Sequence, residues 1–216
     1  MGNNRLLIMD SMLDSPNAQP ISSNWCSRPV EVVAPELVGC ILVRKLPDGR
    51  QLRGMIVETE AYGPNDPACH GYRGRTPRTE VMFGPAGMSY VYLIYGMYHC
   101  FNVVTDQENI ASAVLIRALD LEAIPEWVSD KKRKQPHRIA AGPGKLCQVM
   151  DIDRALSARP LVPSEALWLE HRTRDTQHRL TDGTWSLHQT TRIGLSKGID
   201  TPWRWYLKGS RCVSKA

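Results

Sequence analysis

The feature that most restricts the fold is a long run without any charged side chain, residues 81–105. Its length alone would permit a membrane span, which needs about 20 consecutive and predominantly apolar residues. Glycine and proline interrupt its first part, and four tyrosines together with His99 and Asn102 make the rest too polar for a bilayer core. The run therefore predicts a β-hairpin of a soluble domain over residues 88–104, with a tight turn at Tyr95-Gly96.

Length and composition indicate one globular domain. A chain of 216 residues exceeds the usual domain of about 150 residues by too little to hold two. Residues 1–27 mix Asn, Ser, Asp and Pro without periodicity, so we expect a flexible or loosely docked arm there, with the single domain over 28–216. The 42% hydrophobic content excludes a disordered chain, and the net charge of +5 favours anionic partners such as nucleic acid.

The six cysteines are spread singly, and no C-x-x-C pair occurs. This spacing excludes the usual zinc-ribbon and thioredoxin motifs. Without an export signal, we expect buried, reduced thiols in a cytoplasmic protein, with no membrane segment, metal site or cofactor.

Strand and turn signals predict an α+β domain with an antiparallel sheet. Regular alternation of strand and helix is missing, which argues against a parallel α/β fold. A Pro-Asp-Gly turn joins two apolar runs into a first hairpin, and the uncharged run forms a second. Strands are expected over 40–46, 51–59, 88–104 (as the second hairpin), 113–119, 162–171 and 203–209, helices over 29–37, 120–128 and 144–150, a long loop over 61–87 and a solvated basic turn over 131–134.

Tyrosines gather where the chemistry is expected. Six of the seven lie between Tyr62 and Tyr98. Such a cluster suits a pocket for a planar ligand, or else a tyrosine-rich strand surface. The loop within this span carries Arg73, Arg75 and Arg78, and basic residues interleaved with aromatic ones are typical of nucleic-acid binding.

Two carboxylates precede the aromatic loop. Glu60 lies at the end of a predicted strand and is the natural general base for a pocket beside Tyr62. Glu58 shares its face because side chains alternate along a strand, so a pair of catalytic carboxylates is one interpretation. The other is that one or both form ion pairs with arginines such as Arg53 or Arg117.

These residues, taken in order, resemble the alkyladenine (methylpurine) DNA glycosylase family from about Pro29 to the C-terminus. The similarity rests on the ordered succession of several words, none of which is specific alone. The words are Val57-Glu58-Thr59-Glu60-Ala61-Tyr62, Asp66-Pro67-Ala68-Cys69-His70, Arg75-Thr76-Pro77-Arg78, Met82-Phe83, Tyr90-Val91-Tyr92-Leu93-Ile94-Tyr95-Gly96-Met97-Tyr98, Asn102, Val114-Leu115-Ile116-Arg117-Ala118-Leu119 and Ala141-Gly142-Pro143-Gly144-Lys145-Leu146-Cys147-Gln148.

The resemblance implies a DNA repair enzyme. Such enzymes flip alkylated or deaminated purines, of the 3-methyladenine, 7-methylguanine, hypoxanthine and ethenoadenine class, out of double-stranded DNA and hydrolyse the N-glycosidic bond. It also implies a curved antiparallel sheet like a small open barrel, similar to the C-terminal domain of formyltransferases, with short helices around it and a protruding hairpin that inserts into DNA. We expect a monomer, associated with the nucleoid in a bacterium or located in the nucleus of a eukaryote.

The resemblance assigns roles to single residues. Glu60 would be the general base and Arg117 the residue that holds it, while Tyr95 would intercalate where the base was. The base pocket would consist of Tyr62, His70, Tyr92, Asn102 and Leu115. The DNA backbone would contact Arg73, Arg75, Arg78, Met97, Tyr98 and Lys145.

The lysine distribution and the loop after Tyr62 bear on the mechanism and on the pocket. No lysine occurs between Lys45 and Lys131, which argues against a Schiff-base lyase and for a monofunctional enzyme. A protein that binds damaged bases without cutting, or a hydrolase of RNA or nucleosides, remains an alternative. Family members commonly carry one more residue after the tyrosine, whereas Tyr62 is followed directly by Gly63-Pro64, which affects the expected placement of His70.

Overall fold

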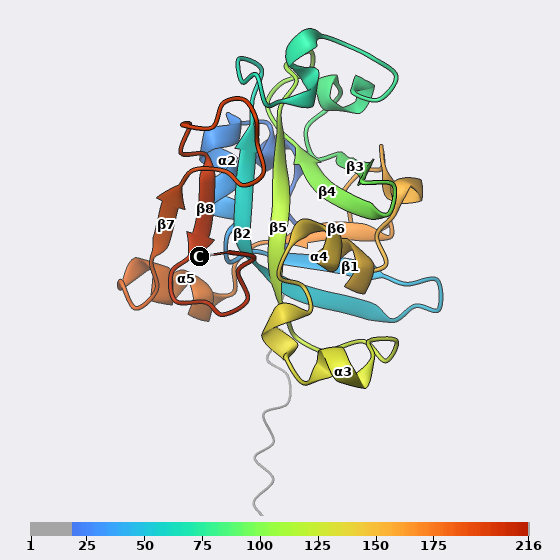
Figure 1. Ribbon diagram of the computed structural model, residues 1–216, viewed down its shortest axis with the longest axis vertical. Coiled ribbons are helices and arrows are strands. Elements are labelled where there is room, and N and C mark those ends of the chain that lie inside the picture. The colour runs from blue at the N-terminus through green and yellow to red at the C-terminus, as the bar shows by residue number, and fades with distance from the viewer. Residues whose placement is uncertain (1–18, 216) are drawn as a thin grey trace, which may run out of the picture.

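The computed structural model describes residues 19–215 as an antiparallel eight-stranded sheet with short helices around it (Figure 1). Six strands follow the order β3-β4-β5-β2-β1-β6, and β8 pairs with both β2 and β7. This confirms the predicted α+β class with an antiparallel sheet. The strands are β1 Ile41–Lys45, β2 Gln51–Tyr62, β3 Ser89–Ile94, β4 Tyr98–Val104, β5 Ala113–Leu121, β6 Leu167–Glu170, β7 Leu187–Thr190 and β8 Arg204–Leu207.

The helices are short. Over residues 19–215, none has the length and apolar character to cross a bilayer. The α-helices are α1 Ser23–Cys26, α2 Val30–Leu37, α3 Asp130–Arg133, α4 Pro143–Val149 and α5 Arg174–Thr181, and the 3-10 helices are η1 His70–Arg73, η2 Glu80–Phe83, η3 Pro136–Arg138 and η4 Arg154–Leu156.

Strand β2 is the centre of the sheet. Its first half pairs with β1, and its register with β5 shifts around Glu58. Beyond this irregularity β8 takes the place of β1, so that Glu60 pairs with Leu115 on one side and Arg204 on the other. The strand was expected to end at Thr59, but it continues to Tyr62, and both carboxylates therefore lie within it.

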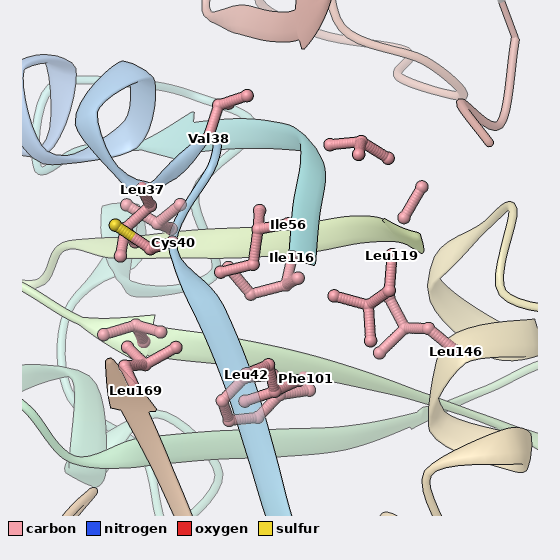
Figure 2. Close-up of a cluster of buried hydrophobic side chains, with 14 of the residues drawn as sticks. Leu37, Val38, Cys40, Leu42, Ile56, Phe101, Ile116, Leu119, Leu146 and Leu169 are labelled. Carbon is pink, nitrogen blue, oxygen red and sulfur yellow. The ribbon is translucent and has the colours of Figure 1, made fainter. Parts of the chain in front are cut away.

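The main core joins the helices to the sheet (Figure 2). Leu37 of α2, Leu42 of β1, Ile56 of β2 and Phe101 of β4 are fully buried in it. Burying a side chain of this size stabilises the fold by about 1.5 to 3 kcal/mol. All six cysteines are free and buried, as the sequence predicted, and they serve as packing residues.

The expected N-terminal arm falls partly outside the described residues, which begin at 19. Within the described part, Ile21 and Cys26 are buried in the main core, and Pro20 forms a β-bridge with Glu170. Burial raises the pKa of the Cys26 thiol to about 12. These residues belong to the packed fold.

The helix predicted over 120–128 is wrong. Strand β5 runs on to Leu121, and the Glu122 amide continues the ladder by donating to the Arg53 carbonyl. Pro125 then interrupts the segment, and the acidic side chains serve ion pairs of Glu122 with Arg53 and of Glu126 with Arg50. Tertiary pairing thus overrides the helical pattern.

The hairpin β3–β4 lies at the free edge of the sheet and has the predicted turn. Tyr95 and Gly96 both have positive φ, 52° and 69°, as a type I′ turn requires, and the Met97 amide donates to the Ile94 carbonyl at 3.3 Å. Tyr95 is 84% exposed and Met97 68% exposed, so the hairpin presents apolar side chains to solvent.

Candidate functional site

A cavity of about 410 Å³ lies between the ends of β2, β3, β4 and β5 and the loops around them. The predicted base-pocket residues all line it, and Arg117, Arg78 and Tyr95 do so as well. Four of the six clustered tyrosines, Tyr62, Tyr90, Tyr92 and Tyr95, therefore belong to a pocket wall and not only to a strand surface. The predicted members are Tyr62, His70, Tyr92, Asn102 and Leu115, and further walls come from Tyr90, Cys100, Pro143, Ile193 and Leu195.

One wall consists of aromatic rings that pack edge-on or tilted against one another, with a hydrogen bond between His70 and Tyr90. The imidazole of His70 packs edge-on against Tyr92 with ring centres 4.6 Å apart, and its Nδ1 lies 2.9 Å from the Tyr90 hydroxyl. Arg78 Nη2 lies 3.3 Å from His70 Nε2. Because a guanidinium only donates, Nε2 accepts and the proton is on Nδ1, which donates to Tyr90. Although this chain has one residue fewer after Tyr62 than family members commonly carry, His70 still lies in the cavity wall.

His70 is neutral in this setting. Burial of the ring, followed by the positive charge of Arg78, lowers the pKa of His70 to about 4. At neutral pH the wall therefore presents an uncharged ring to a ligand.

Glu60 lies behind Tyr62 and is fully buried. Its Oε2 accepts hydrogen bonds from the Tyr62 hydroxyl at 2.7 Å and from Arg117 Nη1 at 3.1 Å, and its Oε1 accepts one from the Ile193 amide at 2.8 Å. Burial opposes the charge of Arg117, but Glu60 and Glu58 outweigh it and raise the pKa of Arg117. These donors hold an ionised carboxylate in one orientation.

Glu58 has a different environment. Its Oε1 accepts hydrogen bonds from Arg117 at 3.0 Å, from Arg204 at 2.8 Å and from the Ser214 hydroxyl at 2.8 Å. Its Oε2 accepts one from the Ser214 backbone amide at 2.6 Å. A carboxylate with so many partners has no accessible lone pair for a reacting group. The ion-pair interpretation applies to Glu58 through Arg117, whereas Arg53 pairs with Glu122 and Glu170 instead.

A family model described as methylpurine-DNA glycosylase (MPG) matches residues 24–211. The chain belongs to the methylpurine-DNA glycosylase family. A relative from Trichodesmium erythraeum is 51% identical over 204 residues, which cover 92% of this chain and 99% of the relative. One from Synechococcus sp. is 51% identical over 194 residues, covering 88% and 96%. One from Methanocella arvoryzae is 48% identical over 202 residues, covering 89% and 94%. Each is named "Putative 3-methyladenine DNA glycosylase". The resemblance found in the motifs is confirmed, and the chain is a member of a family of DNA repair glycosylases.

The sequence did not predict a buried ion pair that lies behind the cavity wall. Arg192 Nη1 and Nη2 donate to the two carboxylate oxygens of Asp66, and Nη1 also donates to the Ala61 carbonyl at 2.8 Å. The guanidinium lies 4.8 Å from the centre of the Tyr62 ring. Arg192 does not line the cavity, so it packs behind the tyrosine, and its neighbour Ile193 supplies the amide that holds Glu60. Asp66 belongs to the family motif Asp66-Pro67-Ala68-Cys69-His70, but no motif in the sequence indicated that Arg192 is its partner.

The basic residues expected to contact the DNA backbone differ in their surroundings. Arg75 donates to Glu80 and Asn109 and packs 4.6 Å from the centre of the Phe83 ring, so local contacts occupy its guanidinium. Arg73 is exposed at the end of η1.

Lys145 lies on α4, outside the cavity of about 410 Å³. Partial burial and the charges of Arg138 and Lys132 lower its pKa. Lys145 and Lys132 line a separate pocket of about 320 Å³ with the exposed Trp127. Helix α4 still connects this region to the larger of these two cavities, because Pro143 lines that cavity.

Proposed function

We propose that this protein is a monofunctional DNA glycosylase that removes alkylated or deaminated purines from double-stranded DNA. One observation carries the proposal: a fully buried carboxylate, Glu60, lies directly behind the aromatic wall of a cavity of about 410 Å³ and is held there by Arg117. The substrate class is that of 3-methyladenine, 7-methylguanine, hypoxanthine and ethenoadenine, and the protein acts as a monomer without a cofactor.

The damaged base enters the cavity between Tyr62 on one side and Tyr92 with His70 on the other. Flipping costs a few kcal/mol, and each base–aromatic stack returns about 1 to 3 kcal/mol. Two stacks are therefore of the right size to offset extrusion. A neutral His70 suits this role, because a charged imidazole would repel a purine made cationic by alkylation. Asn102 and Leu115, paired across β4 and β5, form a fixed wall against purines with the wrong substituents.

The glycosidic bond breaks by attack of water at C1′. Glu60 acts as the general base for that water, and the bonding electrons leave with the purine. Arg117 touches both the carboxylate and the cavity, so it orients Glu60 and stabilises its charge. The described part of the cavity wall contains no lysine, which supports hydrolysis rather than a Schiff-base mechanism.

The hairpin opens the duplex. Tyr95 is the most exposed large apolar side chain on it, and we propose that it fills the space left by the flipped nucleotide. Met97 and Tyr98 follow it against the DNA backbone, and Arg73, Arg78 and Lys145 contact phosphates. Arg75 is the weakest of these candidates because Glu80 and Asn109 already hold it.

A single-turnover assay tests this function. The substrate is a duplex with one hypoxanthine or one 7-methylguanine, and alkali reveals abasic sites. We expect alkali-dependent cleavage by the wild type, its loss in Glu60→Gln with lesion binding retained, and no covalent adduct on borohydride treatment. Lesion binding without abasic product on either duplex would indicate a damage-binding protein, and a trapped adduct would contradict the monofunctional assignment.

A further inference from the structure

The hydroxyl of Tyr62 lies between the buried carboxylate and the cavity. Tyr62 lines the cavity, whereas Glu60 is fully buried and does not. Their oxygen atoms are 2.7 Å apart. A water molecule in the cavity therefore meets the phenol before it meets the carboxylate.

The direction of this hydrogen bond is fixed. Glu60 also accepts hydrogen bonds from the Arg117 guanidinium and the Ile193 amide, as an ionised carboxylate does. Burial, followed by the charge of Glu60, raises the pKa of Tyr62 well above its usual value near 10. The phenol therefore stays protonated and donates to Glu60, and its oxygen lone pairs remain available to accept a hydrogen bond from water.

We propose that Tyr62 relays the proton from the attacking water to Glu60, in addition to stacking on the base. As the water oxygen bonds to C1′, the bond from C1′ to the purine nitrogen breaks and its electron pair leaves with the base. The water proton passes to the phenolic oxygen while the phenolic proton passes to Oε2 of Glu60. Tyr62 ends unchanged and Glu60 ends protonated. The relay rests on the proposed glycosylase function.

Two simpler roles make different predictions. If Tyr62 only stacks on the base, its hydroxyl can be removed without effect on the chemical step. If the hydroxyl only blocks access to Glu60, removing it increases the rate. Of the three roles, only the relay predicts that removing the hydroxyl slows excision and leaves the affinity for the lesion unchanged.

The test compares Tyr62→Phe with the wild type in single-turnover excision of hypoxanthine. Phenylalanine keeps the ring and removes the hydroxyl. General acid–base groups contribute about 100-fold or more to the rate, so we expect at least about a 100-fold loss. Lesion affinity, measured in a Glu60→Gln background, should remain within about 3-fold. Tyr72→Phe is the matched control, because Tyr72 is half-exposed and does not line the cavity.

Two further measurements exclude a general loss of structure. In mixtures of H₂O and D₂O, the wild-type rate should vary nonlinearly, as expected when two protons move together, and this requires no variant. The double variant Tyr62→Phe with Glu60→Gln should be no slower than Glu60→Gln alone, because residues of one relay are not additive.

The relay is overturned if Tyr62→Phe excises as fast as the wild type or faster, if its loss of rate follows an equal loss of binding, or if the wild-type isotope dependence is linear. Absence of abasic product from the wild type would instead contradict the proposed function, so the two failures are distinguishable.

Discussion

Asp66 and Arg192, separated by 126 residues in the sequence, form a buried ion pair directly behind the Tyr62 wall of the cavity. The pair connects the loop that leads to His70 with the loop that supplies the Ile193 amide to Glu60. A single contact thereby fixes both a wall of the pocket and the orientation of the carboxylate behind it.

Replacing one member of this pair should be costly. Asp66→Asn leaves the Arg192 charge buried without a full counter-charge, and breaking a buried pair typically destabilises by about 3 to 5 kcal/mol. We expect a decrease of about 3 kcal/mol in the free energy of unfolding, measured in urea. Asp130→Asn, on the exposed first turn of α3, serves as the control and should change the stability little. Equal stability of the two variants would contradict the role of the pair.

Tyr95 combines backbone strain with the side chain proposed to enter the duplex. Its positive φ is unfavourable for tyrosine and natural for glycine. Tyr95→Gly should therefore leave the stability unchanged or raise it by up to about 1 kcal/mol, while excision from duplex DNA falls about 10-fold or more because the wedge is gone. Thermal unfolding and single-turnover excision check both effects. Excision as fast as the wild type would remove Tyr95 from the flipping mechanism.

His70 should titrate below its usual range. Burial and Arg78 lower its pKa to about 4, so the ring is neutral from pH 8 down to about 5. The unfolded state, with a pKa near 6.5, binds the proton first, so this residue lowers the stability as the pH falls from about 6.5 toward 4. NMR of the imidazole protons measures the pKa directly. Arg78→Gln should raise it, and an unchanged value would mean that Arg78 exerts no charge effect on the ring.

Lys145 should contribute to the salt dependence of DNA binding. Each phosphate contact adds about 0.9 to the slope of log affinity against log salt concentration. Lys145→Gln should reduce that slope by about 1, equally for damaged and undamaged duplexes. Lys134→Gln, an exposed change after α3, should leave it unchanged. Equal slopes for both variants and the wild type would place DNA away from α4.

The predictable part of the fold came from local signals. Alternating apolar residues and a two-residue turn were enough to predict the hairpin at Tyr95-Gly96 and the strand that follows it. Helix α4 was marked by a glycine and a proline at its start. Helix α5 was missed because only Thr176 is buried on it, so no apolar face appears in the sequence.

The candidate site was predictable where its residues are neighbours in the chain. Glu60 and Tyr62 are two positions apart on one strand, and their shared face follows from the alternation of side chains. Arg117 was among the expected partners of Glu58, but its other two partners could not be found in this way, since Arg204 and Ser214 come from the last part of the chain. Only the pairing of β8 with the centre of β2 brings them together.

The position of Glu60 on a strand paired on both sides separates two kinds of change. The surfaces proposed to contact DNA and the base, the β3–β4 hairpin and the segment at His70, lie at the edge of the sheet or outside it. On the proposed function, substitutions there would alter which lesions are accepted while Glu60 keeps its place. In evolutionary terms, this arrangement would let lesion preference diverge without a change in the proposed chemistry.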